Sequence, residues 1–164
     1  WSALLKGACF VTEVPLCRWD AAAHYDPDPE APGNVCYARH GAFVASCDLF
    51  DVQTFSISAA EAKAMDPQQR MLLEVAGEIL SKDNRHSSAR GLADVSVRVG
   101  MCNYDWMLQV SGEPANAFTA SAGHPSITAS RVSFVFGLRG NSMVIDTACS
   151  ASLAAVDAAA ADFR

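Results

Sequence analysis

The segment from Met143 to Phe163 constrains the fold of this chain more than any other part of the sequence. Met143-Val144-Ile145 is a short apolar run, which predicts a buried strand. The next four residues, Asp146-Thr147-Ala148-Cys149, are small or polar and predict a turn. From Ser150 to Phe163 most residues are Ala, Leu or Val, which predicts a buried helix. With the helices and strands predicted upstream, this pattern favours an α/β layered fold.

Cys149 lies in this turn, at the predicted start of the helix. The first N–H groups of a helix have no acceptor inside it, and with the helix dipole they favour a negatively charged sulfur. The same groups can hold the oxyanion of a tetrahedral thioester intermediate. The alternative is a buried cysteine that acts as a small hydrophobic side chain. That second interpretation is kept for the other five cysteines: Cys9, Cys17, Cys36, Cys47 and Cys102.

Two helices and a strand are predicted upstream. Asp66 and Pro67 suit the cap and first position of a helix that runs to about Ser81, with Gln69 completing a capping box and the polar stretch from Lys82 to Arg90 ending it. Its apolar face is predicted to comprise Leu72, Val75, Ala76, Ile79 and Leu80. Alternation of Val95, Val97 and Val99 predicts a half-buried strand that ends at Gly100. A helical pattern from Pro125 to Phe136 stops at Gly137.

Residues 18–43 are rich in Asp, Pro and Gly, which favours a long loop over a helix. Its aromatic residues are Trp19, Tyr25, Tyr37 and Phe43. Linkers between domains seldom carry so many aromatic residues, so we expect an ordered loop that packs on other parts of the chain. A linker is the alternative interpretation.

The composition narrows the function classes. Twelve basic and 18 acidic residues give a net charge of −6 without a basic cluster, so neither nucleic acid nor an anionic membrane is an expected partner. No apolar run is long enough to span a membrane. The scattered histidines and the absence of CxxC or HExxH motifs predict no metal site. Six cysteines leave a disulfide framework open, but we expect reduced thiols in a cytosol-like compartment. Both ends begin or stop mid-pattern, and we expect a fragment of a longer polypeptide.

Several motifs resemble those of one enzyme family. The run from Asp146 to Leu153 resembles D-T-A-C-S-S-S-L, the active-site motif of the ketosynthases of modular polyketide synthases and related fatty acid synthases, with Ala151 replacing a serine. Phe55-Ser56-Ile57-Ser58, Glu61-Ala62 and the run from Ala64 to Arg70 are similar to the family's F-x-I-S-P-R-E-A-x-x-M-D-P-Q-Q-R block. Ala59-Ala60 stand where the family usually has Pro-Arg, and Asn141 replaces a proline. These departures lie outside the turn, so we expect altered packing rather than lost activity.

The resemblance implies a thiolase-like αβαβα fold. Residues 1–164 would form part of the N-terminal half of one ketosynthase domain, without its first strand and without a second domain. It implies that Cys149 is the acyl-accepting nucleophile with its backbone N–H in the oxyanion hole, and that Asp146, Thr147, Ala148 and Ser150 support the turn. The reaction would be acyl transfer followed by decarboxylative Claisen condensation with a malonyl carrier thioester.

The resemblance also implies partners. An acyl carrier protein would deliver its phosphopantetheine arm, no cofactor or metal would bind directly, and the full-length protein would be a cytoplasmic homodimer, with a plastid location also open. The family's two catalytic histidines match none of His24, His40, His86 and His124, so this chain alone is expected to be inactive in condensation. His124 is interpreted as a solvated or capping residue before Pro125.

Three alternatives share the fold. A non-elongating ketosynthase would bind or transfer acyl groups without condensing them, and only the missing histidines distinguish it from an elongating one. A structural subunit related to chain-length factors normally lacks the cysteine. A degradative thiolase has the nucleophile but lacks the Asp-Pro-Gln-Gln-Arg and Asp-Thr-Ala-Cys runs.

Overall fold

The computed structural model describes residues 1–82, 95–110 and 116–163. The chain divides into two compact units, residues 1–46 and residues 47–164. Within the described ranges, no helix is both long enough and apolar enough to cross a membrane.

The first unit is built around a two-stranded antiparallel sheet. Strand β1 (Val11–Glu13) pairs with β2 (His40–Ala42), and Thr12 lies opposite Gly41. A short helix, α1 (Ser2–Leu5), precedes β1, and a 3₁₀ helix, η1 (Ala21–His24), follows it in the chain. Strands β1 and β2 and helix η1 were not predicted, because three- and four-residue elements are too short to show a hydrophobic period.

Three aromatic residues of the 18–43 loop contact other residues of the same loop. The rings of Trp19 and Phe43 meet edge to face with their centroids 5.8 Å apart. The Arg39 guanidinium lies over the Tyr25 ring at 5.0 Å from its centroid, a cation–π contact. These contacts are those of an ordered loop rather than a linker. Trp19, Tyr25 and Tyr37 are nevertheless exposed, so the prediction that the aromatic residues of the loop pack on other parts of the chain was wrong for these three.

The second unit is organised around two parallel strands. Strand β3 (Val97–Gly100) pairs with β4 (Ser142–Ile145), so that Val97 lies opposite Ser142 and Gly100 opposite Ile145. Alternate residues of β3 face opposite sides of this sheet. Val97 and Val99 pack into the core clusters, whereas Gly100 lies against the start of the last helix.

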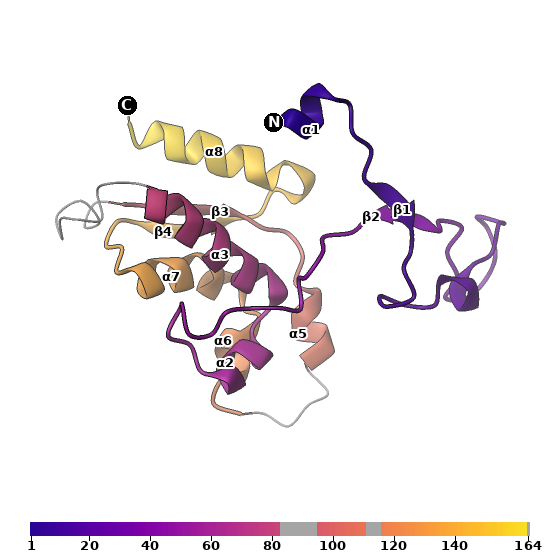
Figure 1. The fold of residues 1–164 in the computed structure, drawn as a ribbon, viewed down its shortest axis with the longest axis horizontal. Helices are drawn as coiled ribbons and strands as arrows, with labels where there is room; N and C mark the ends of the chain where they lie inside the picture. Colours follow the sequence, from indigo (N-terminus) through magenta and orange to yellow (C-terminus); the bar gives the residue numbers. More distant parts are fainter. Residues whose placement is uncertain (83–94, 111–115, 164) are drawn as a thin grey trace. The chain divides into compact units, whose positions relative to one another are not determined.

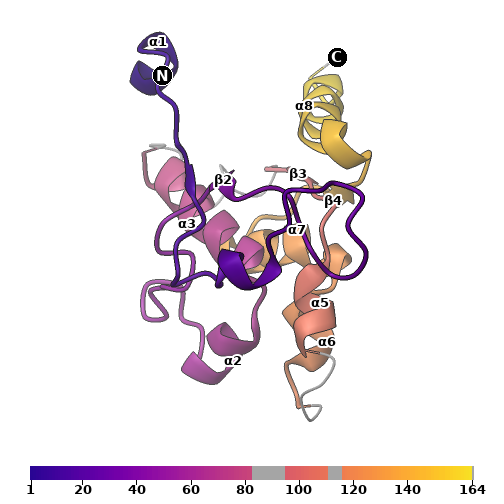
Figure 2. The ribbon, with the colours of Figure 1, turned by 90° about the vertical axis from the view of Figure 1, so that its right-hand side faces the viewer.

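Helices cover both faces of the β3–β4 pair. Figures 1 and 2 show α8 on one side of the strands and α7 on the other, with α3 packed against α7. The α/β layered arrangement predicted from the sequence is therefore confirmed. The helices of this unit are α2 (Ala59–Ala64), α3 (Pro67–Lys82), α5 (Asp105–Val110), α6 (Thr119–Ala122), α7 (Pro125–Phe136) and α8 (Ala151–Ala161).

The apolar face of α3 differs from the predicted one. Leu73 is completely buried and packs with Met65 and Val132 in the core. Val75 and Ile79 were predicted to be buried but are exposed, because α3 turns the stripe through Gln69 and Leu73 toward α7. The helix reaches Lys82, close to its predicted end at Ser81, and the remainder of the polar stretch predicted to stop it lies outside the described residues.

The start of α3 is capped as predicted, but without a capping box. The Gln68 N–H donates to Asp66 Oδ1 at 2.7 Å, and Pro67 is the first helical residue. Gln69 does not bond back to the cap. Its amide instead donates to the Ser121 carbonyl oxygen at 3.3 Å and accepts Arg131 Nε at 2.8 Å. Burial of Gln69 beside α7 thus prevailed over the local pairing.

Helix α7 has the predicted bounds. His124 is its N-cap and accepts the Ser126 N–H at Nδ1, which confirms the capping interpretation of that histidine. Gly137 ends the helix with φ +66°, a conformation that glycine adopts without a steric penalty.

Helix α8 was predicted to be buried, and that prediction was wrong. Ala151 and Ala155 are buried against the strands, whereas Leu153 is 76% exposed and Phe163 is 91% exposed. Val156 is also exposed. The helix packs on β3 and β4 with one stripe of alanines, so its other faces have no partner among the described residues. It also begins one residue later and ends two residues earlier than predicted.

Candidate active site

The turn after β4 is built by short-range hydrogen bonds of its own side chains. Asp146 Oδ1 accepts the Ala148 N–H at 3.0 Å, a bond typical of aspartate in turns. The Ser150 hydroxyl donates to the Thr147 carbonyl oxygen at 2.8 Å and lies 2.9 Å from Thr147 Oγ1. The structure thus brings the five predicted site residues together in one turn.

Cys149 lies in the 3₁₀ helix η3 (Ala148–Ser150), two residues before α8 begins. Its side chain is exposed. Ala148, directly before it, has φ +53°, in the left-handed region that residues with a Cβ rarely adopt. Non-glycine residues in that region cluster at functional sites, where the surrounding contacts hold them in place.

The backbone N–H groups around Cys149 are largely used inside the turn. The Ser150 N–H donates to the Thr147 carbonyl oxygen at 3.3 Å, and the Ala151 N–H donates to that of Ala148. The Ala148 N–H is taken by Asp146. Among the described residues 148–151, the Cys149 N–H is the amide that has no acceptor. A free amide therefore lies on the same residue as the exposed thiol.

A glycine allows the start of α8 to approach the sheet. A Cβ placed on Gly100 would lie 2.4 Å from the Ala151 carbonyl carbon and 2.5 Å from the Ser152 nitrogen, far inside van der Waals contact. At the other end of α8, the Arg98 guanidinium binds Asp162 Oδ2 at 2.7 Å and the Asn141 carbonyl oxygen at 2.7 Å. The Arg98 side chain is only 5% exposed. Two residues of β3 thus fix both ends of α8.

Asn141 binds Val97 and Arg98 through its backbone carbonyl oxygen. Its carbonyl oxygen accepts the Val97 N–H at 2.8 Å as well as Arg98 Nη1. A proline at this position would offer the same carbonyl oxygen, so the departure noted in the sequence does not alter either bond.

A tyrosine from the loop after β3 reaches the turn. The Tyr104 hydroxyl donates to Asp146 Oδ2 at 2.7 Å. The Ala148 N–H, and secondarily this hydroxyl, hold the pKa of the Asp146 carboxyl below its ordinary value. The same bond raises the pKa of the Tyr104 phenol. At neutral pH the pair is therefore a phenol that donates and a carboxylate that accepts.

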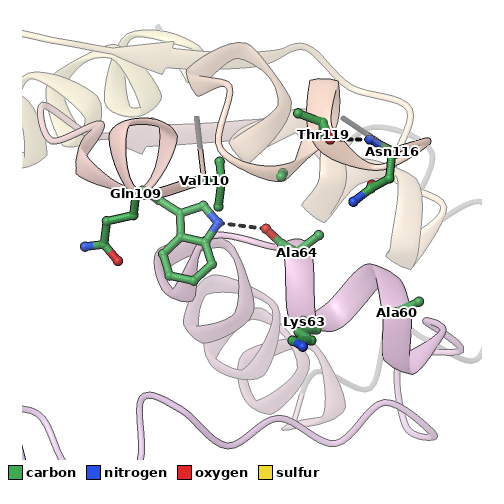
Figure 3. Close-up of a pocket in the computed structure, with 9 residues that line it drawn as sticks. Ala60, Lys63, Ala64, Gln109, Val110, Asn116 and Thr119 are labelled. Carbon is green, nitrogen blue, oxygen red and sulfur yellow. Dashed lines mark hydrogen bonds between the residues drawn. The ribbon is translucent and has the colours of Figure 1, made fainter. Parts of the chain in front are cut away.

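A pocket lies elsewhere, among α2, α5 and α6 (Figure 3). Its volume is about 440 Å³, and Lys63 is its charged lining residue. The Trp106 indole N–H donates to the Ala64 carbonyl oxygen at 2.7 Å, which fixes the ring as one wall. A second pocket is lined by residues that include Phe55, Glu74 and Phe136. Cys149 lines neither, so the structure does not place the thiol in either of these cavities.

The remaining cysteines do not fit the predicted role. Cys9, Cys17, Cys36 and Cys102 are exposed, and Cys47 is half-buried. The interpretation of these five as buried hydrophobic side chains was wrong, since short loops carry most of them at the surface. None of the six cysteines, all of which lie in the part of the chain that the structure describes, forms a disulfide. Among the described residues, no group of three or more His, Cys, Asp or Glu side chains could hold a metal ion.

Comparison with known proteins identifies the family. Residues 1–164, the whole chain, match the model of the β-ketoacyl synthase N-terminal domain. The chain belongs to the β-ketoacyl synthase family.

Similar ketosynthase sequences occur in bacterial polyketide synthases. The chain is 41% identical over its full length to a phenolphthiocerol/phthiocerol polyketide synthase of Mycobacterium tuberculosis (strain CDC 1551 / Oshkosh) and covers 11% of that protein. It is 39% identical to polyketide synthase GfsB of Streptomyces halstedii and covers 3% of it. The chain therefore spans about a tenth or less of these curated relatives.

Solved ketosynthase structures have the same fold. An oxazolomycin ketosynthase domain of Streptomyces albus JA3453 superimposes with a TM-score of 0.82 at 32% identity, covering 95% of this chain and 27% of that one. The ketosynthase from module 6 of the bacillaene synthase of Bacillus subtilis 168 gives 0.77 at 25% identity, covering 98% and 25%. The expected thiolase-like fold, present in part, is confirmed.

The sequence did not predict three residues that hold this turn and α8 in place. Gly100 was interpreted only as the end of a strand, although its missing side chain admits α8. Arg98 lies between Val97 and Val99, where the alternation of the predicted strand leaves a position facing away from the valines, although its side chain is buried against Asp162. Tyr104 lies 42 residues before Asp146, so no local pattern joins the two. The sequence indicates only that Tyr104 follows the predicted strand ending at Gly100, and that strand pairs with β4, which leads into Asp146.

Proposed function

We propose that Cys149 of this β-ketoacyl synthase chain accepts an acyl group from a thioester during polyketide biosynthesis. The observation that carries the proposal is an exposed thiol beside the free N–H of its own residue, in a turn whose neighbouring amides already have acceptors. A thiol that attacks a carbonyl carbon needs access, and the oxyanion that forms needs a donor close to the sulfur. Ala148 in the left-handed conformation supports the same role.

The first half of the proposed reaction is a transthioesterification. The Cys149 thiolate attacks the thioester carbonyl of an acyl group held on the phosphopantetheine thiol of an acyl carrier protein. The oxyanion accepts the Cys149 N–H, and collapse of the intermediate breaks the bond to the carrier sulfur, which leaves as a thiolate. Neither a metal nor a nicotinamide takes part in this step, and the phosphopantetheine arm arrives with the carrier.

The second half is the condensation. A malonyl carrier thioester loses CO₂, the electron pair released attacks the acyl carbon, and the Cys149 sulfur leaves, which gives the β-ketoacyl carrier product. We propose that this half needs histidines outside the present chain, because the four histidines here match neither histidine of the family's catalytic pair: His24, His40, His86 and His124. Residues 1–164, as part of the N-terminal half of one ketosynthase domain, would then be inactive in condensation when isolated. The complete protein is proposed to be a homodimer in the cytoplasm or a plastid.

Adduct mapping tests the proposal. The complete polypeptide that carries this chain is treated with cerulenin or iodoacetamide, and the modified cysteines are identified by mass spectrometry. We expect Cys149 to react first, and preferential labelling of another cysteine would contradict the assignment. Cys149→Ala should abolish acyl transfer, whereas Cys17→Ala, the matched change of another exposed thiol, should retain it. Acyl transfer without any condensed product would identify a non-elongating ketosynthase.

A further inference from the structure

The loop that follows β3 is joined to the Cys149 turn by one carboxylate. Asp146 Oδ2 accepts the Tyr104 hydroxyl at 2.7 Å, and Asp146 Oδ1 accepts the Ala148 N–H at 3.0 Å. Both oxygens of the carboxylate are thus engaged, one by a side chain from a distant part of the sequence and the other by the residue before Cys149. A carboxylate held at both oxygens keeps one orientation.

That orientation bears on the least favourable backbone conformation of the turn. Ala148 has φ +53°, and a residue with a Cβ leaves this region unless its surroundings hold it there. Its N–H bond to Asp146 is one such restraint. The conformation of Ala148 determines the direction in which both the side chain and the N–H of Cys149 leave the turn.

Tyr104 is partly buried at the edge of the core. Its ring packs against the cluster of Val99, Met101 and Ala129. Its carbonyl oxygen accepts the Met107 N–H at 3.1 Å. The ring is therefore held by contacts that do not involve its hydroxyl, so the hydrogen bond from this hydroxyl holds the Asp146 carboxylate in one place.

We propose that Tyr104 is a positioning residue for Cys149 and acts through Asp146 and the Ala148 N–H. The proposal deepens the proposed function and rests on it, because positioning matters only if the Cys149 thiol takes part in the reaction. Tyr104 touches neither the thiol nor the acyl group. It restrains the turn that presents them to each other.

The variant Tyr104→Phe removes one hydroxyl and leaves the ring in its cluster. In the complete polypeptide, the rate of iodoacetamide alkylation at Cys149 is measured by mass spectrometry against that of Cys17 in the same molecules. We expect the Cys149 rate to fall roughly tenfold, the effect of losing one hydrogen bond to a charged group. The Cys17 rate should not change. Tyr37→Phe removes the same hydroxyl at an exposed position and should alter neither rate.

Acyl transfer gives a second readout. In Tyr104→Phe, kcat for transfer from an acyl thioester should fall by a similar factor, while KM stays within about twofold, because the substrate contacts are unchanged. A structural defect that unfolds part of the protein would lower the alkylation ratio and kcat only in proportion to the folded fraction. Circular dichroism and hydrogen exchange of α8 measure that fraction.

A double-variant cycle tests the route through Asp146. If Tyr104 acts through this carboxylate, adding Tyr104→Phe to Asp146→Ala should change the Cys149 rate by less than about twofold. A full tenfold loss in that background, or a wild-type Cys149 rate in Tyr104→Phe alone, would overturn the proposal. The proposed function fails separately, if Cys149→Ala retains acyl transfer.

Discussion

Gly100→Ala adds one methyl group between β3 and the start of α8. That methyl carbon would lie 2.4 Å from the Ala151 carbonyl carbon and 2.5 Å from the Ala151 oxygen and the Ser152 nitrogen. Carbon atoms meet at about 3.5 Å or more, so the overlap is about 1 Å. All three neighbours are backbone atoms that cannot rotate away. The start of α8, with Cys149 just before it, must move or the strand must buckle.

Overpacking of this kind costs about 1–3 kcal/mol, which corresponds to hydrogen exchange in α8 that is roughly 5- to 150-fold faster. Displacing the thiol by about 1 Å should also lower acyl transfer by as much as about 100-fold. Both effects can be measured in the complete polypeptide, the first by hydrogen exchange mass spectrometry of peptides from α8 and the second by acyl loading of Cys149.

Gly77→Ala is the matched control. Its methyl carbon would lie 3.4 Å from Phe55 Cε1 and 3.5 Å from Phe136 Cζ, which is ordinary contact. Because Gly77 is inside α3, alanine there should stabilise the helix by about 0.5–1 kcal/mol. The steric reasoning is refuted if Gly100→Ala shows wild-type exchange in α8 and wild-type loading, or if the two alanine variants behave alike.

Three further predictions concern the packing that supports the site. Arg131→Met should destabilise the protein by about 2–4 kcal/mol in urea unfolding, because it leaves the buried side of Glu61 unpaired, and adding Glu61→Gln should recover part of that loss. Burial raises the pKa of the Asp66 carboxyl, so the free energy of unfolding should fall as pH rises from about 4 through the raised pKa. Asp66→Asn keeps a side-chain cap for α3 and should remove that pH dependence in urea unfolding. Asp66→Ala removes the cap and should cost about 0.5–2 kcal/mol. Leu73 is buried, so Leu73→Ala should lower the free energy of unfolding by about 2–5 kcal/mol, whereas Ile79→Ala at an exposed position of the same helix should lower it by less than about 0.5 kcal/mol. Equal losses of the two variants in thermal unfolding would contradict the observed orientation of α3.

Local signals predicted the elements of the second unit best. Pro125 and Gly137 bound α7 as predicted, since a proline at the first turn and a left-handed glycine act on adjacent residues alone. The apolar run before Asp146 predicted β4 for the same reason. Such signals do not depend on which other parts of the chain lie nearby.

Long-range packing explains what the sequence did not predict. Gln69 carries the pattern of a capping box, but the neighbouring Arg131 is a partner that only the folded chain brings close. The composition of α8 predicts burial on most faces, whereas its actual exposure depends on what packs against it. For the candidate site, the motif located Cys149 and its turn, while Tyr104, Arg98 and Gly100 follow from the register of β3 against β4 and α8.

Helix α8 is attached to one strand at both of its ends, by close backbone contact at Gly100 and by an ion pair at Arg98. A helix held in this way cannot slide along its axis, and one residue of slippage would carry the preceding turn by about 1.5 Å. The ion pair between Arg98 and Asp162 therefore keeps α8 from moving along its axis, and so keeps the Cys149 thiol at the opposite end of the helix in place. Asp162→Asn weakens this ion pair. Although Asp162 is exposed, where a substitution ordinarily has little effect, this variant should lower the acyl loading of Cys149.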